Sequence, residues 1–347
     1  MPAPSHSAGA FGNEPWSASD MEVVAQDIAS PDKPGPLGAD PELALGGPAG
    51  SEASELQMGA GEKSTSRTSL FRLTAVTFIE NKLAVAGMAI LVLLVLFCFV
   101  GPLVYHTNQV NTRLAMETLP PGPGHPLGTD DVGYDVLGRL MVGGQTSLEV
   151  GFGAALVAVI VGVLWGAVAG YVGGVVDALM MRIVDAFLSI PVLFLLLFLA
   201  TVFRPSVLML IGVVGLTAWL IPARLVRGET LTLRTREYVQ AAKTMGVKAP
   251  TIIVRHIVTN SVGTILVNAT FQIADAILVV AALSFLGLGI PPPAANWGAM
   301  LSNGLNFTYS GYWWLVYPAG IAIVVTVVAF NLVGDGLRDA FGTDRRR

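Results

Sequence analysis

The sequence predicts an all-α membrane protein with six transmembrane helices. Of its 347 residues, 53% are hydrophobic and only 13% are charged, whereas an ordinary soluble domain carries about 25% charged residues. The apolar residues also gather in segments close to the roughly 20 residues that a helix needs to cross about 30 Å of hydrocarbon. These two observations indicate that the chain spans a lipid bilayer several times.

Six such segments follow one another along the chain. The third and fourth are joined only by Arg204 and Pro205, so we expect them to form a tight helical hairpin. The predicted spans are residues 83–105, 148–171, 183–203, 206–221, 265–288 and 313–333.

The distribution of Lys and Arg predicts the orientation, because cytoplasmic loops carry an excess of these residues. With the N-terminus inside, the inner segments hold seventeen Lys and Arg. The outer segments then hold only three, which are Arg113, Arg139 and Arg204. Both termini are therefore predicted to be cytoplasmic.

Composition divides the chain into four regions. Residues 1–67 are predicted to be a disordered acidic cytoplasmic tail, since residues 1–62 contain ten acidic residues and one lysine and too little apolar sequence to form a core. Residues 68–82 suit an amphipathic helix at the membrane interface, or a simple extension of the first span. Residues 83–340 form the predicted transmembrane domain, and residues 341–347 a basic cytoplasmic tail.

Several function classes are excluded by what the sequence lacks. Cys98 is the only cysteine, so neither an internal disulfide nor a Cys/His metal site is expected. No phosphate-binding G-x-x-x-x-G-K-[ST] run occurs, no basic soluble patch suits nucleic acid, and no nucleophile and base are paired within the spans. We therefore expect no catalytic residue, metal or cofactor in this chain.

The cytoplasmic stretch 224–261 is too long for a simple connector. Its residues 232–245 predict one helix, with Gly246 where helices commonly end in a left-handed cap. Pro250 suits the start of a second helix, because its missing N–H costs nothing there. The small residues Ala241 and Ala242 would let another protein approach the backbone closely. By itself, this pattern favours an ordinary amphipathic surface loop.

Specific motifs favour an element that contacts another protein over an ordinary surface loop. The run Glu237-Tyr-Val-Gln-Ala-Ala-Lys-Thr-Met-Gly246, followed by Ile252-Ile-Val-Arg-His-Ile-Val-Thr-Asn260, resembles the EAA loop of ABC-importer permeases, in particular the DppC/OppC-type subunits of the peptide/nickel branch. Four further blocks resemble the same family: His125-Pro-Leu-Gly-Thr-Asp-Asp131 with Asp135-Val-Leu-Gly-Arg139, Gly170-Tyr-Val-Gly-Gly-Val-Val-Asp177 with Met181-Arg-Ile-Val-Asp185, Leu283-Ser-Phe-Leu-Gly-Leu-Gly289 with Asn296-Trp-Gly298, and Phe330-Asn-Leu-Val-Gly-Asp-Gly-Leu-Arg-Asp339.

The resemblance covers about residues 68–340 and implies a type I importer permease fold. It also implies partners: a homologous permease, two cytoplasmic ATPase subunits that bind ATP and Mg, and an external substrate-binding protein. The loop 236–250 would be the coupling helix that docks on an ATPase. Ala241, Ala242 and Gly246 would shape it, and Glu237 would cap or anchor it, for instance by pairing with an arginine such as Arg234 or with one on the partner.

The chain departs from the family pattern at four positions. Gln240 stands in place of the motif's glutamate, and Thr259 in place of a proline. Tyr134 replaces an arginine of the external block, and Val280 replaces an acid that is frequent in the fifth span. The last two departures weaken any inference about the substrate from the pore.

Asp275 is the one acid deep within a predicted span. Ionisable groups in the membrane usually face a cavity or a partner. One interpretation is a pore-lining group that meets the amino terminus or backbone of a peptide. The other is a structural pair with a polar group on another helix or on the partner permease.

The implied function is a permease subunit for di- or oligopeptides in the bacterial plasma membrane. An importer of nickel chelates or other small solutes is the alternative within the same branch. A stand-alone secondary transporter fits less well, because it would need coupling-ion sites and broken midplane helices. The external acids Asp130, Asp131 and Asp135 lack the ligand spacing of a calcium hand. We expect them to serve contact with the binding protein or the partner permease.

Overall fold

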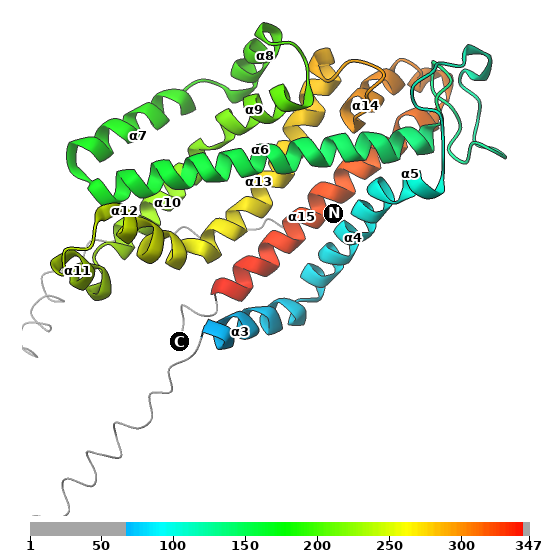
Figure 1. The fold of residues 1–347 in the computed structure, drawn as a ribbon. Coiled ribbons are helices and arrows are strands. Elements are labelled where there is room, and N and C mark those ends of the chain that lie inside the picture. The colour runs from blue at the N-terminus through cyan, green and yellow to red at the C-terminus, as the bar shows by residue number, and fades with distance from the viewer. Residues whose placement is uncertain (1–66, 343–347) are drawn as a thin grey trace, which may run out of the picture. The chain divides into compact units, whose positions relative to one another are not determined.

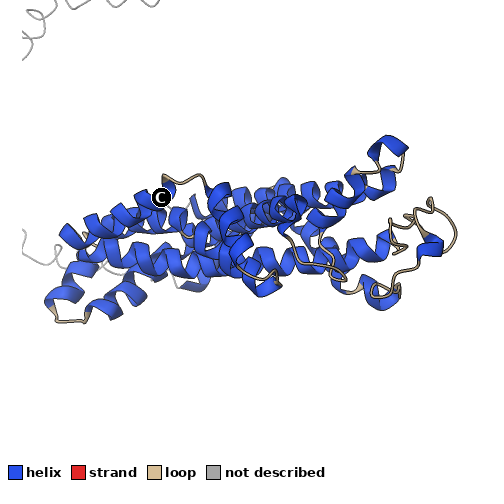
Figure 2. Ribbon diagram, turned by 90° about the horizontal axis from the view of Figure 1, so that it is seen from above, coloured by secondary structure: helices blue, strands red, loops and turns tan. Residues whose placement is uncertain are grey.

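The computed structural model describes residues 67–342, with side chains from residue 74 onward. These residues belong to one compact unit, Thr65–Arg347. Within the described range the chain forms helices and loops and no β-strand, as Figure 2 shows. The all-α prediction is therefore confirmed for this part of the chain. The predicted acidic tail lies outside the described residues except for Arg67, and so do residues 343–347 of the predicted basic tail.

Two helices open the described chain. Helix α3 (Arg67–Glu80) is separated from α4 (Lys82–Phe99) by Asn81, whose side-chain oxygen accepts hydrogen bonds from the backbone N–H groups of Leu83 and Ala84. This N-cap makes α3 a helix of its own. The interfacial amphipathic character expected for residues 68–82 stays a prediction. Short α5 (Gly101–Val104) follows α4.

Helix α6 (Val136–Val172) has 37 residues, which corresponds to about 55 Å at 1.5 Å per residue. It begins twelve residues before the predicted start of the second span. The side chain of Asp135 sets this start by accepting a hydrogen bond from the N–H of Gly138 at 2.8 Å. Figure 1 shows α6 running along most of the helical body. A helix of this length exceeds the hydrocarbon thickness and extends beyond it.

The third and fourth predicted spans are each bent. Helices α7 (Gly174–Leu188) and α8 (Val192–Val202) meet at 82°, with Pro191 between them. Helices α9 (Val207–Ala218) and α10 (Leu220–Leu233) meet at 43°. Within the described residues, four helical segments are continuous enough to span a membrane, or up to six if each bent pair is one span. The count of six therefore stays a prediction.

The C-terminal half begins with two short helices, α11 (Glu237–Thr244) and α12 (Ala249–Ile252). A π-helical turn and a 3-10 turn then lead into α13 (Val262–Leu283). After a second π-helical turn, α14 (Trp297–Leu305) precedes the last helix, α15 (Tyr317–Gly342). The last helix extends nine residues beyond the predicted end of the sixth span.

The main core lies between α4, α6, α13 and α15. It includes Leu91, Leu148, Ile277 and Phe330. In Figure 1, α15 lies between α4 and α13. Many large apolar side chains on the outer surfaces of these helices are exposed. Such surfaces suit lipid or a neighbouring membrane helix.

Candidate functional site

The loop predicted to be cytoplasmic and to couple to another protein forms a helix, a glycine turn and a second helix. Its first helix, α11, begins at Glu237 and not at residue 232 as expected. Residues 232 and 233 belong to the end of α10. The side-chain amide of Gln240 donates to the carbonyl of Arg234 at 2.7 Å, at the break between the two helices. We call α11, the turn and α12 (residues 237–252) the knob.

The end of α11 is fixed by two backbone hydrogen bonds across Gly246. The N–H of Gly246 donates to the carbonyl of Lys243, and the N–H of Val247 donates to the carbonyl of Ala242. This pair of bonds is the Schellman motif, which requires a left-handed residue at the glycine position. Gly246 has φ +80°, so the predicted cap is confirmed. Pro250 lies in the first turn of α12, also as predicted.

Four buried side chains form the cluster that holds the knob: Val239, Ala242 and Ile252 within it, and Ile257 in the π-helical turn that follows. Tyr171 of α6 and Leu233 of α10 pack against this cluster. The knob is therefore seated on the ends of these two long helices. Ala242 is only 4% exposed, so it shapes the knob from within and is not available for contact with another protein.

The opposite face of the knob is open. Ala241, Lys243 and Lys248 are exposed, and Met245 is 76% exposed. An exposed methionine one helical turn from a small residue offers an adaptable apolar contact.

Glu237 does not form the expected pair with Arg234. The guanidinium of Arg234 instead donates to the carbonyl of Gly170 on α6 at 2.9 Å. Glu237 is exposed in the first turn of α11, where a negative charge interacts favourably with the helix dipole. Its carboxylate remains accessible to a partner.

Asp275 lies on α13 with its side chain on the surface of this chain. No hydrogen bond or ion pair is found for it within the described part of the chain. A structural pair inside this subunit is therefore not observed. The neighbouring residues Ala274 and Ala276 are buried, so Asp275 lies on the outer side of α13. This position is compatible with a pore or with a second permease.

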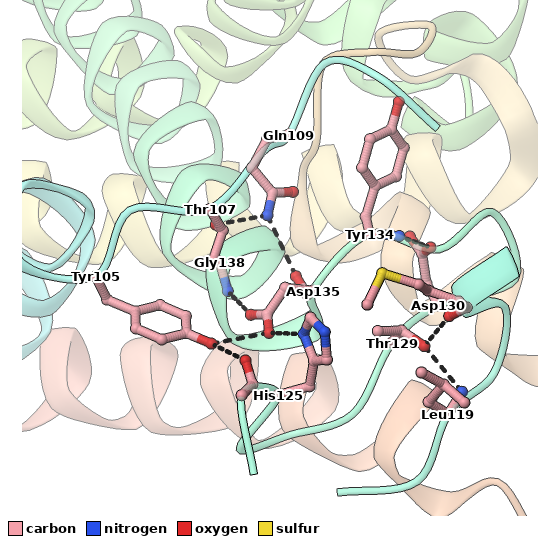
Figure 3. A network of polar contacts seen from close by, with 12 residues as sticks. Tyr105, Thr107, Gln109, Leu119, His125, Thr129, Asp130, Tyr134, Asp135 and Gly138 are labelled. Carbon is pink, nitrogen blue, oxygen red and sulfur yellow. Dashed lines mark hydrogen bonds and ion pairs between the residues drawn. The ribbon is translucent and has the colours of Figure 1, made fainter. Parts of the chain in front are cut away.

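Asp135 organises the loop between α5 and α6 (Figure 3). One carboxylate oxygen caps α6, and the other accepts from the Tyr105 hydroxyl at 2.9 Å and contacts His125 Nδ1 at 2.8 Å. The Asp135 residue is only 3% exposed. Burial, together with the hydrogen bond to Asp135 and its charge, raises the pKa of Tyr105 to about 12. The sequence marked Asp135 as part of an external motif but did not predict these partners.

A second set of contacts fixes the acids beside this network. Asp130 accepts from the N–H groups of Val132 and Tyr134, and burial raises the pKa of the Asp130 carboxyl. The guanidinium of Arg139 stacks on the Tyr134 ring at 4.0 Å. Tyr134, which replaces the family's arginine, thus supports the neighbouring arginine by a cation–π contact. No group of three potential metal ligands occurs among residues 67–342.

Sequence reasoning missed the ion pairs between α7 and α10, of which the more buried joins Arg227 and Asp177. Arg227 of α10 binds both carboxylate oxygens of Asp177 on α7, at 2.5 and 2.7 Å. The two residues are 50 positions apart in the sequence. Asp177 stood within a recognised motif and Arg227 within a basic segment, but neither pattern indicated the partner.

A bundle of long apolar helices joined by structured loops is the architecture of a multi-pass membrane protein. The family model described as binding-protein-dependent transport system inner membrane component matches residues 162–347. A second model, the N-terminal TM domain of oligopeptide transport permease C, matches residues 69–121. The chain belongs to the family of binding-protein-dependent transport system inner membrane components. The resemblance seen in its motifs is thereby confirmed.

Curated relatives are similar in sequence to this chain over most of its length. The oligopeptide transport system permease protein OppC of Escherichia coli K12 is 43% identical over 265 residues, which are 76% of this chain and 87% of the relative. OppC of Bacillus subtilis is 38% identical, over 85% of this chain and 97% of the relative. The dipeptide transport system permease protein DppC of B. subtilis is 40% identical, over 77% of this chain and 84% of the relative.

Proposed function

We propose that this chain forms half of the translocation pathway of an ATP-driven importer for di- or oligopeptides. The single observation that carries the proposal is the knob, a preformed and capped element with an exposed contact face that is seated on α6 and α10. The similarity to oligopeptide and dipeptide permeases supports peptide as the solute. It favours peptide over nickel chelates and other small solutes.

In this proposal the chain pairs with a homologous permease and receives its solute from an external substrate-binding protein. Two cytoplasmic ATPase subunits bind ATP and Mg, and each closes on the knob of one permease. ATP shifts the transporter between outward- and inward-facing states only through its different affinity for those states. The exposed residues Glu237, Ala241 and Met245 contact the ATPase, while Ala242 and Gly246 keep the contact face in shape.

The chain lies in the bacterial plasma membrane with six spans and with both termini in the cytoplasm. The knob is then on the ATPase side, and the loop organised by Asp135 is outside. Fusion of a reporter that is active only in the cytoplasm tests this arrangement. A fusion after residue 342 should be active, and an insertion at the exposed Gly124 should be inactive. The reverse pattern would overturn the orientation.

Asp275 faces the solute pathway or the partner permease. Its exposed position on α13 supports both roles, and an Asp275→Asn variant separates them. Altered peptide affinity with a normal complex supports the pore, whereas loss of the second permease from the complex supports assembly.

Purification of the tagged chain from gently solubilised native membranes tests the main proposal. The expected result is recovery of a second permease and of ATPases with nucleotide-binding motifs, in stoichiometric amounts. ATP-dependent peptide uptake by the reconstituted complex would complete the test. Recovery of this chain alone, under conditions that preserve known complexes, would contradict the proposal and favour a stand-alone transporter.

A further inference from the structure

Two arginines of α10 and Arg234 directly after it reach neighbouring helices. Arg227 makes the two-bond contact with Asp177 at the start of α7, and Arg234 binds the Gly170 carbonyl at the end of α6. Arg224 binds Asp185 further along α7 at 2.5 Å. Helix α10 is thus connected to α7 by two ion pairs.

The two ion pairs differ in burial. The side chains of Arg227 and Asp177 are 33% and 12% exposed, whereas those of Arg224 and Asp185 are 52% and 48% exposed. An exposed ion pair held by one hydrogen bond contributes little to stability. A bidentate arginine–carboxylate pair fixes both distance and orientation, because the planar guanidinium matches both oxygens. Arg227–Asp177 is therefore the contact that defines the position of the first turn of α7.

Helices α6 and α10 form a rigid pair. Gly162, Gly166 and Gly170 lie at four-residue intervals on α6, and a Cβ atom at each would fall within 3 Å of a backbone carbonyl oxygen of α10 or of Trp219 just before it. Small residues at this spacing allow helix backbones to meet directly. The close contact leaves little room for the two helices to move independently.

The knob is attached to this pair on one side and joined irregularly to α13 on the other. Tyr171 and Leu233 pack into its core from the ends of α6 and α10. Towards α13 the chain passes through a π-helical turn, Ile253–Ile257, and a 3-10 turn, Val258–Ser261. Such interruptions of regular helical hydrogen bonding often mark hinges.

We propose that the Arg227–Asp177 ion pair is a positioning contact that transmits displacement of the knob through α10 to α7. This inference rests on the proposed function of the knob. Movement of the knob displaces α6 and α10 together, and the bidentate pair requires the start of α7 to follow. The interrupted segment before α13 allows that helix to move differently. Movement of the knob would thus be coupled to α7 through the contacts of α10.

An Arg227→Lys variant tests the proposal, because lysine keeps the positive charge but cannot form the bidentate pair of hydrogen bonds with Asp177. The complex purified with this chain is reconstituted in liposomes with its binding protein and labelled alanine peptides of two to five residues. We expect the ratio of peptide imported to ATP hydrolysed to fall at least fivefold. A merely structural defect would lower both activities in proportion and leave the ratio unchanged. Arg224→Lys is the matched control and should keep the wild-type ratio.

A distance measurement tests the same contact without transport. Spin labels are placed at Leu179 on α7 and Thr232 on α10, both exposed, while the only native cysteine, Cys98, is fully buried. In the wild-type complex we expect one narrow distance distribution, with and without ATP. The Arg227→Lys variant should give a broad one.

The outcomes separate the two proposals. A wild-type complex without ATP-driven peptide uptake would contradict the proposed function, while the distance measurement would still decide whether Arg227 fixes α7. Unchanged distances in Arg227→Lys, or an unchanged import ratio in an active complex, would overturn the positioning role.

Discussion

The backbone N–H of Val247 donates to the carbonyl of Ala242 at 3.1 Å, across the left-handed Gly246. This bond closes the end of α11 and turns the chain towards α12. A Cβ atom at Gly246 would meet no atom within 4 Å. The requirement for glycine is therefore conformational and not steric.

Replacement of Gly246 by valine should destabilise the turn by about 1–2 kcal/mol, because a β-branched residue disfavours positive φ. We expect ATP hydrolysis to become uncoupled from transport as the knob loses its shape. Gly246→Asn should retain most activity, since asparagine tolerates this conformation. Gly228→Ala is the control, because Gly228 lies inside α10 with open space around its Cβ position. Unchanged coupled transport in Gly246→Val would count against the coupling role.

The adjacent alanines should respond differently to enlargement. Ala242→Leu overfills the buried cluster and should lower the stability of the knob by about 1–3 kcal/mol. Ala241→Leu adds bulk on the exposed face and should leave thermal unfolding unchanged while reducing recovery of the ATPases. Thermal unfolding and quantitative co-purification distinguish these effects. Equal behaviour of the two variants in both measurements would refute the assignment of inner and outer faces.

Asp275→Asn should not reduce the stability of the isolated subunit, since no partner for the carboxylate is found within residues 67–342. Its effect should occur in the assembled transporter, as a changed peptide affinity or a loss of the second permease. Asp335→Asn, which alters an exposed pair with Arg338, is the matched control. A large loss of stability in purified Asp275→Asn subunit would show that this carboxylate has a structural role inside the chain.

Asp135→Ala should remove the cap of α6 and leave Tyr105 and His125 without their shared acceptor. Loss of an N-cap costs about 0.5–2 kcal/mol, and the lost contact to His125 adds to this cost, while the Tyr105 hydroxyl keeps its hydrogen bond to the carbonyl of Gly124. We expect lower thermal stability and weaker recruitment of the binding protein. Asp131→Ala, at a neighbouring acid of the same loop, provides the comparison and should change stability little. Equal losses from the two substitutions would argue against a special role for Asp135.

Tyr105 should contribute a pH dependence at alkaline pH. Its pKa rises from 10.0 to about 12 in the folded chain, so the folded state retains the proton more strongly than the unfolded state. The stabilising contribution is complete below pH 10 and is lost as the pH rises towards 12. Tyr105→Phe should remove this part of the alkaline decline, as measured by thermal unfolding between pH 9 and 12. An identical decline in the variant would contradict the assignment.

Local sequence patterns predicted the features that depend on neighbouring residues. The position of Gly246 and the presence of Pro250 in the first turn of α12 follow from backbone preferences that act over a few residues. Helix limits were less accurate where distant contacts decide them. Helix α6 starts at Val136 because Asp135 caps it, although the hydrophobic pattern placed the span from residue 148.

The expected pair between Glu237 and Arg234 illustrates the same limit. The two residues are close in sequence and opposite in charge, yet Arg234 meets a carbonyl of α6 instead. The break between α10 and α11 redirects the side chains, and the packing of α6 against α10 supplies the competing acceptor. A helix continuous over residues 232–245 would have placed the two charges on one face.

By itself, the sequence determined that this is a helical membrane protein, where its apolar segments lie, and that a capped knob projects from them. Composition and short-range backbone preferences are sufficient for these conclusions. Only the tertiary structure decided that Ala242 faces inward and Ala241 outward, that Asp275 is exposed, and that Arg227 binds Asp177 fifty residues away. Such relationships depend on which helix surfaces meet, and helix packing places distant residues in contact by a geometry that no local pattern specifies.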